Sequence, residues 1–102
     1  MQIESWNTEV DGPLSEAALR HKLESRGFSV TRYVYSPGTC FPRHTHAVDK
    51  MDALLSGEFR IVMEGAEVLL RAGDALFVPA GVAHSAEVVG DESVVSLDGI
   101  RD

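Results

Sequence analysis

Three histidines are the residues of this chain whose types and spacing could do chemistry. His44 and His46 lie two residues apart, and in an extended strand such side chains leave on the same face. His84 lies far along the chain, behind Gly73 and the sequence Pro79-Ala80-Gly81. Neutral imidazole is the commonest metal ligand in proteins. Two neighbouring histidines, joined by a third when the chain folds, therefore indicate a metal site.

Composition sets the broad class of protein. The chain has 102 residues, of which 44% are hydrophobic and 25% charged, as expected for one globular domain. The net charge is −7 and the nine basic residues are scattered, which disfavours binding to nucleic acid or to anionic membrane surfaces. The single cysteine, Cys40, cannot form an intramolecular disulfide. With no leader pattern and no apolar stretch of membrane-spanning length, we expect a cytoplasmic protein.

The N-terminal part of the chain predicts a short extended segment and one helix. Met1–Trp6 alternates in the manner of a strand, and Leu14–Arg26 has a narrow apolar stripe on one helical face before Gly27 ends it. The residues of that stripe are Leu14, Ala17, Ala18 and Leu23. The helix is expected to pack on the outside of a sheet, with His21 exposed to solvent.

The rest of the chain predicts short strands separated by turn signals. Pro42 interrupts the second of these strands, which favours an edge position or a bulge. Close, regular spacing of short strands is typical of an antiparallel sandwich or barrel, and a jelly roll suits this number of strands. The predicted strands are Phe28–Tyr35, Cys40–His46, Lys50–Leu55, Phe59–Met63, Glu67–Leu70, Ala75–Val78, His84–Val89 and Val94–Leu97.

Two motifs in this region resemble those of the cupin superfamily. The first runs Gly38, five residues, His44-Thr45-His46, three residues, Lys50, six residues, Gly57. The second runs Gly73, five residues, Pro79-Ala80-Gly81, two residues, His84. The resemblance covers about Val30 to Leu97.

The resemblance implies a fold and a cofactor. Cupins are six- to eight-stranded β-barrels, often dimeric, that usually hold a divalent metal through two histidines and a glutamate of the first motif and a histidine of the second. We therefore expect an all-β jelly-roll barrel over residues 30–102. Residues 1–29 would be an N-terminal strand and helix extension that packs on the barrel within a single domain. A homodimer is expected, because pairing would cover open sheet edges.

The chain departs from the family pattern at Lys50, which stands where the family glutamate usually lies. An ammonium group cannot ligate a metal. Either Asp49 or Asp52 could replace the glutamate as a fourth ligand, or Lys50 and Asp52 could form an ion pair that lines the pocket. The three histidine positions of the family are matched by His44, His46 and His84.

Two functions of different classes remain open at this point. Three neutral imidazoles leave open positions on a divalent metal (Fe, Zn, Ni, Cu or Mn), which can acidify water, polarise a carbonyl or bind oxygen. The first function is a metal-dependent enzyme, an oxygenase or an isomerase/lyase, acting on a small molecule with Lys50 or Asp52 in acid–base roles. The alternative is a non-catalytic module that binds or senses a metal or small molecule.

Three further side chains bear on the pocket. Tyr33 and Tyr35 are expected to pack in the barrel, with a candidate role as polar groups in the pocket. Cys40 shares the parity of His44 but lies four residues from it. We therefore expect it to be a buried core thiol and not a metal ligand, unless a bulge at Pro42 shortens the path between them.

Overall fold

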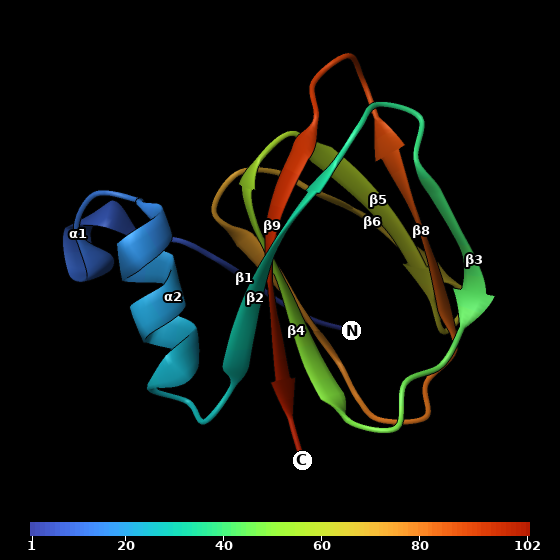
Figure 1. The fold of residues 1–102 in the computed structure, drawn as a ribbon, viewed down its shortest axis with the longest axis horizontal. Helices are drawn as coiled ribbons and strands as arrows, with labels where there is room; N and C mark the ends of the chain where they lie inside the picture. The colour runs from blue at the N-terminus through green and yellow to red at the C-terminus, as the bar shows by residue number, and fades with distance from the viewer.

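Nine β-strands make up most of the molecule in the computed structural model, which describes residues 1–102 (Figure 1). The helices are α1 (Thr8–Asp11) and α2 (Glu16–Glu24), and both precede the second strand. The strands are β1 (Gln2–Ser5), β2 (Ser29–Tyr35), β3 (Cys40–His44), β4 (Asp49–Ser56), β5 (Glu58–Met63), β6 (Ala66–Leu70), β7 (Asp74–Val78), β8 (His84–Val89) and β9 (Val94–Arg101).

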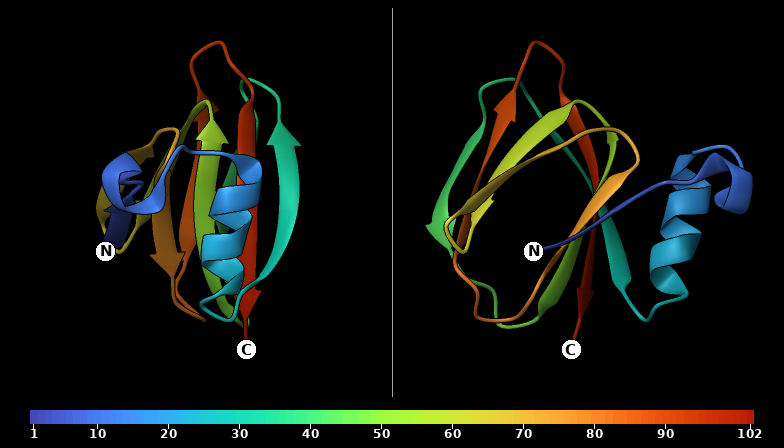
Figure 2. Two further views of the ribbon diagram at one scale, coloured as in Figure 1. Left: turned by 90° about the vertical axis from the view of Figure 1, so that its left-hand side faces the viewer. Right: turned by 180° about the vertical axis from the view of Figure 1, so that it is seen from behind.

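The strands form two antiparallel sheets that face each other (Figures 1 and 2). One sheet has the order β1-β7-β4-β9-β2 and the other has the order β3-β8-β5-β6. Consecutive strands thus alternate between sheets over much of the chain, as in a jelly roll. The predicted all-β jelly-roll class with an N-terminal helix is confirmed.

Alternation along the central strands separates two hydrophobic cores. On β4, Leu54 points between the sheets, whereas Met51 and Ala53 point to the outside of the five-stranded sheet. The inner core contains Leu54, Phe59, Ile61, Met63, Leu70, Leu76, Val78, Val88 and Val94. The outer core contains Leu19, Leu23, Phe28, Met51, Ala53, Ala75 and Leu97. Each strand face therefore has its own packing partner.

Helix α2 covers the outer face of the five-stranded sheet, as the turned view shows (Figure 2). The hydroxyl of Ser15 accepts a hydrogen bond from the backbone N–H of Ala18 and caps the helix. The predicted apolar stripe is wrong in part. Leu19, four residues before Leu23, is buried at 3% exposure, whereas Ala17 is exposed. The two leucines lie one turn apart on the same face, so they meet the sheet together.

Other N-terminal features tie this segment to the sheet. Strand β1 pairs antiparallel with β7, and the indole N–H of Trp6 donates to the carbonyl of Gly12. His21 is exposed on α2, as predicted. Neither helix is long and apolar enough to cross a membrane.

A bulge in β3 decides which of its side chains face the interior. Phe41 pairs with Ala86 and His44 pairs with His84, so β3 uses three residue steps where β8 uses two. The irregularity lies at Pro42, in a strand at the edge of its sheet, as the proline predicted. The prediction of a buried Cys40 is wrong, because the extra residue reverses the parity. Its thiol is exposed beside Glu87.

Gly57 lets β4 turn directly into β5. Its φ is 83°, and a Cβ atom there would lie 2.6 Å from the carbonyl oxygen of Ser93. Only glycine fits both constraints. The last glycine of the first motif therefore serves the turn that leads out of β4, the strand that carries Lys50 and Asp52.

Candidate metal centre

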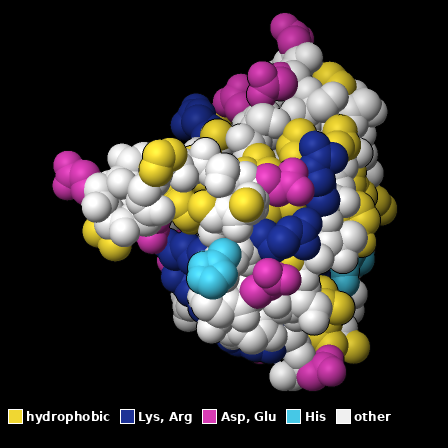
Figure 3. Space-filling view, turned by 60° about the vertical axis from the view of Figure 1, so that its left-hand side comes forward, with side chains coloured by type: hydrophobic (Ala, Val, Ile, Leu, Met, Phe, Trp, Pro, Cys, Tyr) yellow, Lys and Arg dark blue, Asp and Glu magenta, His cyan; other side chains and the backbone are white.

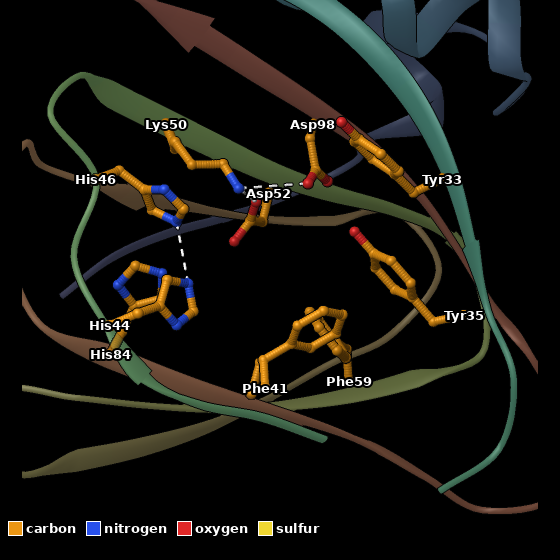
Figure 4. A pocket seen from close by; sticks show the side chains of 11 residues that line it. Tyr33, Tyr35, Phe41, His44, His46, Lys50, Asp52, Phe59, His84 and Asp98 are labelled. Carbon is orange, nitrogen blue, oxygen red and sulfur yellow. Dashed lines mark hydrogen bonds and ion pairs between the residues drawn. The ribbon is translucent and has the colours of Figure 1, made fainter. Parts of the chain in front are cut away.

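Three imidazoles converge at one end of the space between the sheets; we call them the histidine wall (His44, His46 and His84). His44 ends β3, His84 begins β8 as its cross-strand partner, and His46 lies in the connection to β4. The potential ligand atoms of the three residues all lie within 4.8 Å of one another. The two Nε2 atoms of His44 and His46 are 3.1 Å apart (Figure 4).

Backbone carbonyls orient two of these rings. The Nδ1 of His44 lies 2.7 Å from the carbonyl oxygen of Pro42, and that of His84 lies 3.0 Å from the carbonyl oxygen of Val82. A carbonyl oxygen only accepts, so each Nδ1 carries the proton and donates it. Each Nε2 therefore keeps its lone pair, which is the arrangement that metal-binding histidines usually have.

The histidine wall fits a divalent transition metal. Two nitrogens bound to one metal at about 2.0–2.1 Å lie roughly 2.9–3.4 Å from each other, and the distance between His44 and His46 falls in that range. Burial lowers the pKa of His46 to about 4, with the charge of Lys50 adding to the effect. Burial likewise lowers the pKa of His84. Both rings are thus held in the neutral form that ligates metals.

A second cluster lies across the cavity; we call it the charged wall (Lys50, Asp52 and Asp98). Asp52 and Asp98 are direct cross-strand partners on β4 and β9. The ammonium Nζ of Lys50 donates to Asp98 Oδ2 at 3.3 Å and lies 3.4 Å from Asp52 Oδ1 (Figure 4). Ser96 donates to the other oxygen of Asp98 at 2.5 Å. One cation therefore serves two carboxylates that face each other.

Burial shapes the protonation of the charged wall. Asp52 is 5% exposed, and its burial, together with the charge of Asp98, raises its pKa to about 6 even though Lys50 opposes the shift. For Lys50, burial acts to lower the pKa, but the carboxylates of Asp52 and Asp98 outweigh it and the pKa is raised. Lys50 is thus charged at neutral pH, while Asp52 titrates within reach of it.

One oxygen of the charged wall is left without a hydrogen bond. The contact of Asp52 Oδ1 with Lys50 is an ion pair that lacks the angles of a hydrogen bond, and Oδ1 is the only buried side-chain nitrogen or oxygen atom in the protein without a hydrogen-bond partner. Buried polar atoms are rarely left in this state.

The two walls line a cavity of about 210 Å³ that is open to solvent on one side. Tyr35, Phe41 and Phe59 form its apolar side, with ring centroids 4.9–6.1 Å apart. Tyr33 stacks on Tyr35 at 5.9 Å and lines the cavity as well. This volume lies below the range of about 300–1,000 Å³ for the pockets of drug-sized ligands. The cavity therefore suits a small molecule.

The structure brings together some of the predicted residues and not others. Lys50, Asp52, Tyr33 and Tyr35 all line the cavity with the histidines. The group of potential ligands contains neither Asp49 nor Asp52. Asp49 instead accepts the backbone N–H of Ala80 at 2.8 Å. Of the two uses considered for Asp52, the structure has the ion pair with Lys50.

Sequence reasoning missed Asp98. The last strand was predicted to end at Leu97, whereas β9 continues to Arg101. Asp98-Gly99 resembles a turn, yet Ser96 and Asp98 keep the alternation of Val94 and point between the sheets. That alternation is the signal that could have found it. Phe41 also lines the cavity.

The surface seen from the helical side shows no patch of one charge (Figure 3). Basic and acidic side chains are interspersed there. Surface ion pairs of the protein include Arg26 with Glu4 and Arg32 with Glu16.

Comparisons with known proteins agree with this fold. The profile of the Cupin domain family matches residues 31–99. An uncharacterized protein of Streptomyces coelicolor is 27% identical over 84 residues, which are 82% of this chain and 80% of that protein.

Solved structures give the same picture. KdgF from Halomonas sp. superposes with a TM-score of 0.63 at 25% identity, covering 74% of this chain and 70% of that one. The DMSP lyase DddQ from Ruegeria pomeroyi superposes with a TM-score of 0.63 at 30% identity, covering 72% of this chain and 39% of that one. With its family match spanning most of the sequence, the chain belongs to the Cupin domain family.

Proposed function

We propose that this protein is a metal-dependent enzyme that moves a proton on a small organic molecule, as an isomerase or lyase. The observation that carries the proposal is the meeting of two groups in one small cavity. Imidazole lone pairs converge on one side, and a buried carboxyl group with a pKa of about 6 lies on the other.

Each wall has its own part in this reaction. His44, His46 and His84 would hold the metal (Fe, Zn, Ni, Cu or Mn), which supplies a Lewis acid for an oxygen of the substrate. Asp52 would take a proton from the substrate and return it, since a base of this pKa is matched to neutral pH. Lys50 stabilises the ionised form of Asp52.

Proton transfer is favoured over oxygenation because the cavity contains a base. An oxygenase could work with the metal alone, whereas the cost of burying Asp52 is explained by a proton-transfer role. The likeness to a DMSP lyase supports the same choice, though that protein is much longer than this chain. A non-catalytic binding module is the alternative that the assays below separate.

The first test is elemental analysis of tag-free protein. Wild type should contain close to one equivalent of a transition metal, and His84→Ala should lose it. His21→Ala is the matched control, because His21 is exposed on α2 and should not affect metal content. Absence of metal from wild type, even after reloading, would contradict the proposal.

The second test is proton exchange. Metal-loaded protein is incubated in D₂O with small oxo and hydroxy acids, and deuterium incorporation is followed by NMR. Asp52→Asn should slow exchange about 10²- to 10⁴-fold, the usual contribution of a general base. Ligand binding with no exchange for any compound would instead support the binding module.

Four expectations stay predictions: a homodimer, a cytoplasmic location, no binding of nucleic acid, and division into an N-terminal extension and a barrel.

A further inference from the structure

The carboxyl group of Asp52 has one buried oxygen beside Lys50 and one side that faces the cavity. Its side chain is 8% exposed, and Oδ1 is the one buried side-chain polar atom without a hydrogen bond. Asp52 lines the cavity, and Figure 4 shows its carboxyl group turned toward the open space that the histidines face. Oδ1 itself is closed off beside Lys50, so a ligand in the cavity would meet the carboxyl group of Asp52 at its other oxygen.

The ligand group that donates to Asp52 should be uncharged. The Nζ of Lys50 already lies between Asp52 and Asp98, 3.4 and 3.3 Å from one oxygen of each. A second cation placed there would be repelled by the ammonium group. A hydroxyl group can donate a hydrogen bond to Asp52 and also accept one from Lys50, because an ammonium group has three N–H donors. A hydroxyl thus satisfies both residues at once.

The other parts of the ligand follow from the histidine wall and from the apolar side of the cavity. Three neutral imidazoles leave a divalent metal with its full positive charge, which favours an anionic group such as a carboxylate at the histidine wall. Tyr35, Phe41 and Phe59 offer an apolar surface between the two walls. A short hydrocarbon chain fits there within the 210 Å³ of the cavity.

We propose that the cavity selects small carboxylic acids that carry a hydroxyl group a few carbons from the carboxylate. The carboxylate lies at the histidine wall, the hydroxyl donates to the carboxyl oxygen of Asp52 that faces the cavity, and Asp52 is the residue that determines specificity. This inference rests on the proposed metal-dependent pocket and adds the class of substrate.

The test is isothermal titration of nickel-loaded protein with four compounds of similar size: butyrate, 3-hydroxybutyrate, 4-hydroxybutyrate and 4-aminobutyrate. At least one hydroxybutyrate should bind wild type ten times more tightly than butyrate or more. Asp52→Leu should bind that compound and butyrate equally. Asp49→Asn is the matched control and should keep the preference, since Asp49 lies outside the cavity and accepts a hydrogen bond from the backbone N–H of Ala80.

Several results would overturn the inference. Equal binding of all carboxylates by wild type, a hydroxyl preference that survives in Asp52→Leu, or tightest binding of 4-aminobutyrate would each do so. The wild-type series decides by itself if the leucine variant fails to fold. Butyrate that binds wild type but not metal-free His84→Ala would leave the proposed pocket standing even if hydroxyl selection fails. Absence of binding by all four compounds would count against both.

Discussion

The two walls of the cavity differ in how complete they are without a ligand. At the histidine wall, the Nδ1 atoms of His44 and His84 are already satisfied by carbonyls of their own strands or loops. At the charged wall, one ammonium group serves two carboxylates, and one oxygen has no hydrogen bond. Hydrogen bonds to nearby backbone carbonyls therefore orient the histidine wall. The charged wall depends instead on attraction among the charges of its three residues.

The difference follows from where each wall lies in the sheets. The histidines occupy the end of β3, the next connection and the start of β8, where rings can reach backbone carbonyls two residues away. Lys50, Asp52 and Asp98 lie within β4 and β9, which are internal strands of the five-stranded sheet. Charges at internal strand positions are buried, and buried charges must be balanced by one another. Of the two walls, the charged wall should therefore matter more for folding stability, and the histidine wall should matter more for metal binding.

Removal of the shared cation should have the largest effect on stability. Lys50→Met leaves Asp52 and Asp98 facing each other without a counter-charge, and loss of one partner of a buried ion pair costs about 3–5 kcal/mol. Urea unfolding of metal-free protein at pH 7 would measure the loss. Arg32→Met is the control, because its pair with Glu16 is about half exposed and should contribute about 0–1 kcal/mol. Equal stability of Lys50→Met and wild type would contradict this view of the charged wall.

The second largest effect should be the stabilisation of the folded protein by metal, which variants of the two walls should change differently. A metal that binds only the folded state adds about 2.7 kcal/mol at 100 times its Kd. Wild type should gain this amount in urea unfolding with added nickel, and His84→Gln should gain almost none. Lys50→Met, although less stable, should keep most of the increment, since Lys50 is no ligand. A similar loss in both variants would mean that the two walls do not act separately.

The sequence predicted the histidine wall far better than the charged wall. His44, His46 and His84 stand out because their types are rare and their spacing is short or framed by turn residues. Lys50 and Asp52 were noticed only as departures from a motif. Asp98 was missed because its strand seemed to stop at Leu97, and cross-strand register, which places it opposite Asp52, cannot be deduced from one strand alone.

Irregular backbone explains the other differences between expectation and structure. Pro42 indicated a bulge or an edge strand, but a proline does not say how many extra residues the bulge contains. That number sets the parity of everything before it, so Cys40 was expected inside and lies outside. On α2, the short apolar stripe did not show whether Ala17 or Leu19 lies on the buried face of the helix. Contact with the sheet buries Leu19.

Acid should reveal the smallest and most specific difference, because the walls respond with opposite signs. The pKa of Asp52 is about 6 in the folded protein against an ordinary 3.8, so the folded state binds a proton first and the contribution of Asp52 to stability is lost as pH rises through 6. The pKa of His46 is about 4 against 6.5, so the unfolded state binds a proton first and stability is lost as pH falls below 6.5.

Two variants should therefore change the pH profile of metal-free protein in opposite directions. Around Asp52, the facing groups are Lys50, Asp98 on β9, Tyr35 on β2 and His44 on β3, and Asp52→Asn leaves these in place. Urea midpoints from pH 8 to pH 5 should fall more steeply for Asp52→Asn than for wild type, and less steeply for His46→Asn. Parallel profiles for all three proteins would show that neither wall carries the linkage. A change of slope in Asp52→Asn alone would contradict the prediction for His46 and limit the linkage to the charged wall.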